Sequence, residues 1–238
     1  SVQNLRDVRA LADKYKIRLV LDCSLLGENA YLVLQREPEF KDSDMETVIK
    51  TMTGLADLCY FSARKLSSSR GGGICTDSME IFKELEAFIP LYEGFLTYGG
   101  MSIREVEAMA VGLYETLDET IISQSPTFIK YLVDSLDAKG IPMIKPAGVL
   151  GAHVDAMQLC AHIPQTEYPA GALAAALFLI SGVRGMERGS ISNQRDEYGN
   201  ETYADMELLR LAVPRRVFTL SQIKYVEDRL TWLYENRL

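Results

Sequence analysis

The feature that most constrains the fold is a pair of short apolar runs, each preceded by a helical pattern and each ending in a polar side chain. Apolar residues recur at helical spacing over residues 5–12, and residues 17–22 then form a β-rich run that ends in Asp22. A capping-box pattern at residues 43–46 opens a second helix, which precedes the apolar run 57–62. Helices that alternate with buried strands predict an α/β sheet, whose ligands collect at the carboxyl ends of the strands. Asp22 and the residues after Ser62 therefore lie where a functional site is expected.

The pattern changes in the second half of the chain. Up to that point we expect a further strand at residues 72–76 and helices at residues 28–35, 77–88, 103–123 and 125–140. Beyond it we expect short strands at residues 142–145, 152–156 and 207–213, helices at residues 169–181 and 221–236, and a hairpin-like stretch at residues 196–200. The sequence therefore predicts two domains, residues 1–125 and a smaller α+β domain at residues 126–238.

Charge and composition narrow the possible partners and the compartment. A net charge of −8 and a pI of about 4.9 disfavour a nucleic-acid-binding surface, and no apolar run reaches the length of a membrane span, about 20 residues. The cysteines are scattered without a C-x-x-C pair, which predicts free thiols in a reducing, cytoplasmic compartment. The two histidines, His153 and His162, are too few to indicate a structural zinc site, so no metal ligands are expected.

Lys65 is the candidate nucleophile. It follows the second strand, between Ser62 and the serine- and glycine-rich residues 67–73, whose hydroxyl and backbone N–H groups suit a phosphate. A lysine amine can hold pyridoxal phosphate (PLP) covalently, and such enzymes also need a partner for the pyridine nitrogen, a role that Asp22 fits. The alternatives are that Lys65 belongs to a solvated basic turn and that Asp22 caps the following helix.

Four motifs resemble the tyrosine phenol-lyase and tryptophanase family of PLP-dependent β-eliminating lyases. They are LDCSLLGENAY at residues 21–31, FSARK at residues 61–65, YEGFLTYGG at residues 92–100 and ELLRLAVPRRVFT at residues 207–219. The resemblance runs from about residue 4 to the end of the chain and covers the C-terminal half of the family. It implies PLP fold type I, with residues 1–125 as the last part of a large cofactor-binding domain that has a mixed, mostly parallel sheet and flanking helices.

The resemblance also implies roles for single residues. It makes Lys65 the Schiff-base lysine and Asp22 the partner of the pyridine nitrogen, and it places Ser62 and Arg64 beside the cofactor phosphate. Arg210 matches the arginine that binds the substrate α-carboxylate, a task that suits a planar guanidinium. The alternative for Arg210 is a surface arginine.

The segment VRGMERG at residues 183–189 is similar to the tyrosine phenol-lyase version of the family. The resemblance makes Met186 and Arg188 contacts of the substrate side chain and favours elimination of an aromatic ring by C–C cleavage. Three positions depart from the family: Leu25 replaces an arginine, Leu150 replaces the histidine of a Gly-Gly-His motif, and Leu66 replaces an aspartate. These losses favour, as an alternative, C–S cleavage of cysteine or an S-substituted cysteine.

The family's N-terminal half supplies the phosphate loop, the aromatic residue that stacks on the cofactor, the proton-donating tyrosine and one side of a monovalent cation site (K⁺). We therefore expect a complete active site only with a companion N-terminal half. The alternatives are a domain or subunit of a larger biosynthetic enzyme and a non-catalytic, partner-dependent half of a split enzyme. The resemblance further implies a homotetramer built from dimers, with active sites at the dimer interface.

Overall fold

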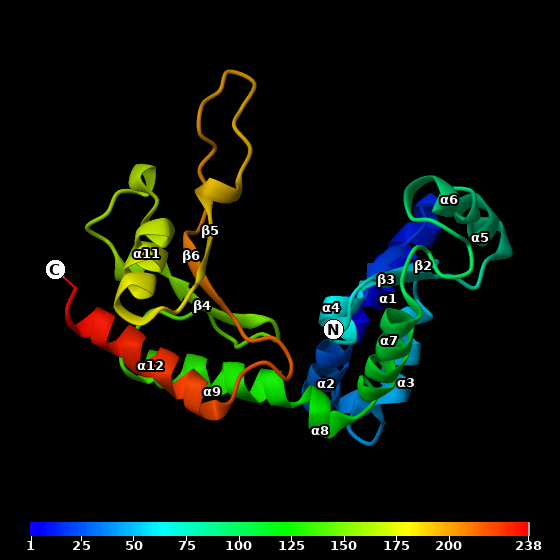
Figure 1. Ribbon diagram of the computed structural model, residues 1–238, viewed down its shortest axis with the longest axis horizontal. Helices are drawn as coiled ribbons and strands as arrows, with labels where there is room; N and C mark the ends of the chain where they lie inside the picture. The colour runs from blue at the N-terminus through cyan, green and yellow to red at the C-terminus, as the bar shows by residue number, and fades with distance from the viewer. Residues whose placement is uncertain (238) are drawn as a thin grey trace. The chain divides into compact units, whose positions relative to one another are not determined.

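The computed structural model describes residues 1–237 and divides into two compact units, Ser1–Ser123 and a second unit that begins at Gln124 (Figure 1). Each unit has a three-stranded sheet of its own. No helix within residues 1–237 combines the length and the apolar character that crossing a membrane requires.

The first unit is a mixed sheet with flanking helices, as predicted. Strands β1 (Val20–Asp22) and β2 (Leu58–Ser62) are parallel, and β3 (Gly72–Cys75) is antiparallel to β2. The helices of this unit are α1 (Val2–Tyr15), α2 (Leu26–Arg36), α3 (Met45–Thr53), α4 (Ala63–Leu66), α5 (Met79–Glu86), α6 (Ile89–Tyr92), α7 (Ile103–Glu115) and α8 (Glu119–Ile122), with a 3₁₀ turn at Pro38–Phe40.

Two local predictions for this unit are wrong in detail. Helix α3 is capped by Asp44, whose side chain accepts from the Thr47 N–H at 2.8 Å, and not by Ser43. The long helix expected at residues 103–123 breaks into α7 and α8, because the Asp118 carboxylate accepts from the Thr120 N–H at 2.8 Å and starts a new helix.

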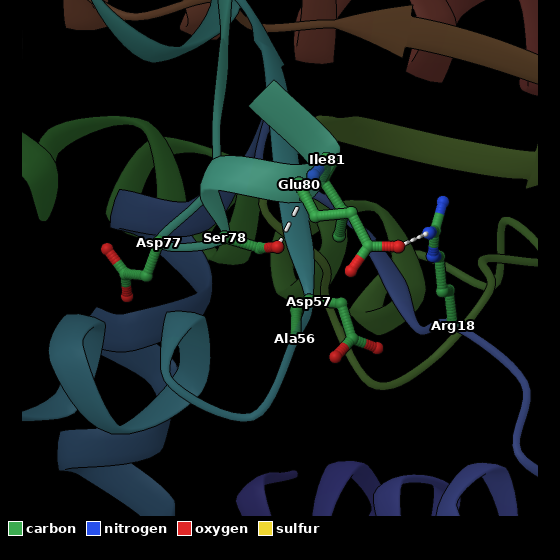
Figure 2. A pocket seen from close by; sticks show the side chains of 7 residues that line it. All are labelled: Arg18, Ala56, Asp57, Asp77, Ser78, Glu80 and Ile81. Carbon is green, nitrogen blue, oxygen red and sulfur yellow. Dashed lines mark hydrogen bonds and ion pairs between the residues drawn. The ribbon is translucent and has the colours of Figure 1, made fainter. Parts of the chain in front are cut away.

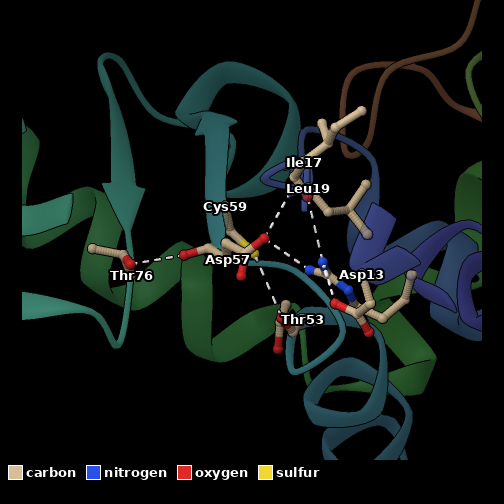
Figure 3. Close-up of polar contacts among 8 residues, drawn as sticks. Asp13, Ile17, Leu19, Thr53, Asp57, Cys59 and Thr76 are labelled. Atoms are coloured by element: carbon tan, nitrogen blue, oxygen red, sulfur yellow. Dashed lines mark hydrogen bonds and ion pairs between the residues drawn. The ribbon is translucent and has the colours of Figure 1, made fainter. Parts of the chain in front are cut away.

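Asp57 joins the elements at the start of the two parallel strands (Figure 3). Its carboxylate accepts from the Leu19 N–H and from Arg9 Nη1, both at 2.7 Å, and its carbonyl accepts from Thr76 Oγ1 at 2.7 Å. Arg9 also pairs with Asp13 at 2.6 Å. Asp57 therefore ties α1 and the entry to β1 through its side chain, and the end of β3 through its backbone carbonyl, to the start of β2.

The second unit packs three helices on one face of an antiparallel sheet. Strand β6 (Leu208–Ala212) lies between β4 (Gly151–Asp155) and β5 (Met186–Arg188). The helices are α9 (Gln124–Ala138), α10 (Ala156–Leu159), α11 (Pro169–Ser181) and α12 (Leu220–Glu235), with 3₁₀ turns at Gln165–Glu167 and Ser190–Ser192. Alternate residues of β4 and β6 join the apolar sides of α9, α11 and α12 in one core, and α9 lies beside α12 (Figure 1).

Most strands and helices predicted for this unit are confirmed, with two exceptions. Residues 142–145 form no strand and contribute only an isolated bridge between Met143 and Val154. Residues 196–200 form a turn in which the Asp196 N–H donates to the Asn200 carbonyl at 3.0 Å, but no strands flank it. Both are short polar or proline-bounded stretches, in which local pattern carries little information about pairing.

Candidate active site

The first group of candidate residues lies at the carboxyl ends of β1 and β2. Asp22 ends β1, in register with Tyr60, and Ser62 ends β2. Lys65 lies one helical turn past β2, on α4, where the sequence suggested a loop. The polar ends of two neighbouring parallel strands thus bring Asp22, Ser62 and Lys65 to one edge of the sheet.

Asp22 is held as a carboxylate. Hydrogen bonds from the Ser24 hydroxyl and the Ser24 N–H lower its pKa, with smaller contributions from the Tyr60 hydroxyl and the positive charge of Lys65. The Ser24 N–H lies 2.9 Å from Asp22 Oδ1. The alternative of a helix cap is wrong, because α2 begins after Leu25 without a side-chain cap. An ionised, exposed carboxylate whose charge interacts with a lysine suits the nitrogen of a protonated pyridine ring.

Ser24 is a site residue that the sequence did not reveal. Its side chain is buried, it donates to Asp22 and it accepts from the Ser62 N–H at 3.1 Å. It therefore couples the end of β1 to the end of β2. A serine two residues after a strand has no distinctive pattern, so only the pairing of the strands shows this role.

The turn that carries Lys65 is fixed from behind by α7. Thr116 Oγ1 donates to the Leu66 carbonyl at 2.9 Å and is buried with it. A Cβ on Gly112 would lie 1.9 Å from the Ser67 carbonyl oxygen, so only glycine allows α7 to approach this closely. Leu66, the residue that departs from the family pattern, is buried against Cys23 and contributes to the core.

Arg64 and Arg70 line a hollow of about 420 Å³ together with Ser68, Ser69 and Glu105. Neither arginine forms an ion pair or a hydrogen bond with a described residue. Ser68 adopts a left-handed backbone conformation with φ of 54°, which turns the chain between the two cations. Two guanidinium groups and two hydroxyls around one hollow fit a phosphate. Sequence analysis assigned Arg64 to this role but missed Arg70.

The second group of candidate residues lies on one face of the β4–β6–β5 sheet. Arg210 is in register with His153 on one side and with Met186 on the other. The guanidinium Nη2 of Arg210 donates to Met186 Sδ at 3.0 Å. Arg188 lies two residues beyond Met186, hence on the same face. The structure thus brings Arg210, Met186 and Arg188 together, and it adds His153, which sequence analysis considered only as a zinc ligand.

Positive charge and burial together determine the electrostatics of this face. Burial and, after it, the charge of Arg188 lower the pKa of Arg210. Burial lowers the pKa of His153, and Arg210 and Arg188 lower it further. Arg210 is half-buried, in contrast to the surface arginine that was its alternative.

A hollow at the other end of the first unit's sheet has a different character (Figure 2). It measures about 350 Å³ and is lined by Arg18, Asp57, Asp77 and Glu80 at the start of β1 and β2. Arg18 pairs with Glu80 at 3.6 Å and with Glu84 at 2.7 Å, so its charge is satisfied within the protein. Among residues 1–237 no three or more His, Cys, Asp or Glu side chains are arranged to hold a metal ion.

Comparisons with known proteins identify the family. The beta-eliminating lyase family matches residues 1–229. A tyrosine phenol-lyase of Pasteurella multocida is 36% identical over 239 residues, which is 100% of this chain and 52% of the relative. A tryptophanase of Salinibacter ruber is 40% identical over 227 residues, 95% of this chain and 48% of the relative. The chain therefore spans about half the length of the curated relatives it matches.

The solved structures extend the likeness to the fold. A serine palmitoyltransferase of S. paucimobilis, with bound PLP, superposes with a TM-score of 0.63 over 96% of this chain and 50% of that chain, at 14% sequence identity. At this identity the likeness concerns the fold, which is fold type I of the PLP-dependent enzymes, as predicted. Together with the match to residues 1–229, this shows that the chain belongs to the beta-eliminating lyase family.

Proposed function

We propose that this chain carries the cofactor lysine of a PLP-dependent lyase that catalyses β-elimination from an amino acid. The observation that carries the proposal is the placement of two residues at the carboxyl ends of neighbouring parallel strands: Asp22 ends β1, and Lys65 follows β2 by one helical turn. The relatives named tyrosine phenol-lyase and tryptophanase support the reaction class. In this proposal the first unit is the last part of the cofactor-binding large domain, and the second unit is the small domain.

The residues of the first unit fit the cofactor. Lys65 Nζ would hold it covalently, Asp22 would accept from its pyridine N–H, and Ser62 and Arg64, with Arg70, would bind its phosphate. Pyridoxal phosphate, when bound, supplies a protonated ring that accepts the electron pair released at the substrate Cα.

Three residues carry the remaining steps of the proposal. Arg210 binds the α-carboxylate of the substrate through two N–H groups, which orients the Cα–H bond. Lys65, once its amine is free, removes the α-proton as general base. Asp22 keeps the pyridine nitrogen protonated throughout, because its lowered pKa leaves it ionised near neutral pH. The β-substituent then leaves, and hydrolysis of the remaining fragment gives pyruvate and ammonia.

Two substrate classes fit the side-chain contacts. Met186 and Arg188 suit an aromatic ring with a polar substituent, which would be lost by C–C cleavage. Leu25 and Leu150 replace an arginine and a histidine of the family pattern. The loss of these polar side chains favours C–S cleavage of cysteine or an S-substituted cysteine. Comparing pyruvate release from tyrosine, tryptophan and an S-alkyl cysteine distinguishes them.

A second candidate function is that of a partner-dependent half, catalytic or not, of a split or larger biosynthetic enzyme. It is favoured by exposed aromatic side chains in the first unit, such as Tyr92 and Tyr114, which are 73% and 78% exposed. For the whole enzyme we propose a companion chain, further copies of this chain in a dimer or tetramer, and a bound K⁺ ion. The free thiols of the described chain support a reducing, cytoplasmic compartment.

Borohydride reduction tests the cofactor role of Lys65. The protein, with any companion chain, is incubated with PLP, reduced and digested, and the peptide that contains Lys65 should gain the mass of the reduced cofactor. Lys65→Ala should abolish the labelling, while the matched surface variant Lys50→Ala should keep it. Labelling of another lysine in the unmodified protein would refute the assignment. Labelling that appears only with a companion chain would support the second candidate.

A further inference from the structure

One face of the second unit's sheet carries a row of three cross-strand neighbours. His153 on β4, Arg210 on β6 and Met186 on β5 are in register, and residues in register on antiparallel strands project from the same face. Arg188 lies two residues beyond Met186 and joins them. The apolar core formed with α9, α11 and α12 occupies the opposite face of the sheet. The row therefore forms a surface distinct from the core.

The positive charge of this face is not balanced by the protein. Arg188 has no ion pair or hydrogen bond with a described residue. Arg210 donates to the weak acceptor Met186 Sδ, and its Nε is buried with no partner. A desolvated guanidinium that lacks a carboxylate is costly, so the arrangement is complete only when an anion is bound.

The other charged groups around His153 do not change this balance. On its own strand, Asp155 projects from the same face, but its carboxylate accepts from the Gln158 N–H at 3.1 Å and from Gln158 Nε2 at 2.6 Å. Residues 142–144, which border the outer edge of β4, contain no titratable side chain. The charges that shift the pKa of His153 are those of Arg210 and Arg188, and Asp155, although it projects from the same face, is not among them.

The imidazole of His153 has one nitrogen available. A hydrogen bond to the Gly151 carbonyl uses one ring N–H, so in the neutral ring the second nitrogen is an acceptor. Burial and the two arginines lower the pKa of His153, which keeps the ring neutral at pH 7 while the face is without an anion. A neutral acceptor cannot donate to an anion, whereas a protonated ring can.

We propose that His153 is a proton-dependent ligand of this anion site: when a carboxylate binds to Arg210, beside the positive charge of Arg188, His153 takes up one proton from solvent and donates its second N–H to the carboxylate. The anion cancels the repulsion that keeps the ring neutral. Because linkage is reciprocal, carboxylate affinity rises as the pH falls toward the range in which His153 titrates. The identity of the carboxylate as that of an amino-acid substrate rests on the proposed function, but the proton uptake does not.

The proposed site differs from one formed by arginine side chains alone in how its affinity for a carboxylate depends on pH. A clamp of two arginines binds carboxylate with nearly constant affinity across neutral pH, because guanidinium groups do not titrate there. A site that includes His153 binds more tightly at lower pH. A shift of one pKa unit in His153 corresponds to about a tenfold change in affinity.

Proton NMR of the imidazole tests this proposal directly. In His162→Gln the one remaining imidazole is His153, and its titration is followed with and without saturating acetate, with methylammonium chloride as the salt control. We expect acetate to raise the pKa of His153 by about one unit, equivalent to a tenfold tighter binding of acetate to the protonated form. Methylammonium chloride should have no such effect.

Two variants test whether Arg210 and His153 themselves are responsible for the pH-dependent binding of acetate. In Arg210→Gln, combined with His162→Gln, the pKa of His153 should be higher without acetate, because one repelling charge is gone, and acetate should no longer shift it. His153→Gln should bind acetate with an affinity independent of pH between 5 and 8. Unchanged His153 titration with acetate bound, or absence of acetate binding, would overturn the proposal.

The same measurement in Lys65→Ala distinguishes this inference from the proposed function. Lys65 lies in the first unit, whereas His153 lies in the second. Acetate should therefore still raise the pKa of His153 in Lys65→Ala. In the protein that retains Lys65, an acetate-dependent shift together with failure of cofactor labelling would refute the cofactor role of Lys65 and leave the proton-linked carboxylate site standing. Absence of the shift, with Lys65 labelled, would refute the carboxylate site and leave the cofactor role standing.

Discussion

The two units bury their apolar residues in different ways. The second unit has one continuous core, in which α9, α11 and α12 pack on the sheet through fully buried residues such as Leu136, Leu177 and Leu209. The first unit has two smaller clusters, and it leaves Leu91 and Phe95 exposed, at 69% and 68%. The second unit therefore has a continuous core, whereas the first divides its buried apolar residues between two smaller clusters, although both units also expose large apolar side chains such as Leu91 and Leu179.

This difference has a functional side. The first unit holds the proposed cofactor groups at the ends of strands that have little core behind them, so Asp22 and Lys65 depend on a few specific polar contacts. The second unit holds Arg210 on β6 and His153 on β4, two paired strands whose other face packs on the core. We expect the loss of a single contact to disturb the positions of Asp22 and Lys65. The positions of Arg210 and His153 should persist as long as the core of the second unit is intact.

The largest expected effect comes from opening the core of the second unit. Leu177→Ala should destabilise that unit by about 2–5 kcal/mol, because the side chain is fully buried and a cavity remains. The matched change Leu91→Ala in the first unit should alter stability by less than about 0.5 kcal/mol in the isolated chain. Urea unfolding monitored by hydrogen exchange measures both. A large effect of Leu91→Ala on the isolated chain would contradict the comparison.

A smaller effect is expected where α7 approaches the cofactor turn. Gly112→Ala places a Cβ 1.9 Å from the Ser67 carbonyl oxygen, and the backbone must move to relieve the clash. We expect a loss of about 1–3 kcal/mol, together with less labelling of Lys65 after incubation with PLP and reduction with borohydride. Gly99→Ala tests whether glycine replacement alone is responsible, since no atom lies within 4 Å of a Cβ there, although its φ of 55° adds strain. Full labelling in Gly112→Ala would show that the turn is held by other contacts.

Removal of the Ser24 hydroxyl should have a local effect. Ser24→Ala takes away a donor to Asp22 and an acceptor for the Ser62 N–H, at a cost of about 1 kcal/mol. The pKa of Asp22 should rise toward its usual value, and carbon NMR of the carboxyl group measures this shift. Ser78→Ala, which removes a helix cap in the same unit, is the control for a general loss of stability. An unchanged Asp22 would mean that other contacts hold its pKa low.

The smallest expected effect is a loss of stability of the first unit at acidic pH. Hydrogen bonds from Arg9 and from the Leu19 N–H lower the pKa of Asp57 in the folded protein. A carboxyl group with a depressed folded pKa stabilises the fold above its unfolded pKa, and this contribution is lost as the pH falls through the folded value. We therefore expect the first unit to weaken below about pH 4. Asp57→Asn should flatten this dependence in hydrogen-exchange profiles, and an unchanged acid profile would argue against the role of Asp57.

The sequence by itself determined the local elements and the residues that resemble the family. Spacing of apolar residues located most helices and strands, and the motifs around Asp22, Lys65 and Arg210 indicated PLP chemistry. These signals are local, because periodicity and capping act over a few residues and a motif keeps its functional side chains close in sequence.

Only the tertiary structure decided which distant residues meet. Ser24 reaches Ser62, Gly112 lies against Ser67, and His153 lies beside Arg210, because strand register and helix packing bring together segments 38 to 57 positions apart. Register depends on which strands pair and in which direction, and neither is encoded in the pattern of a single strand. The sequence thus predicted the chemistry of the cofactor lysine, and the structure supplied the contacts that support it.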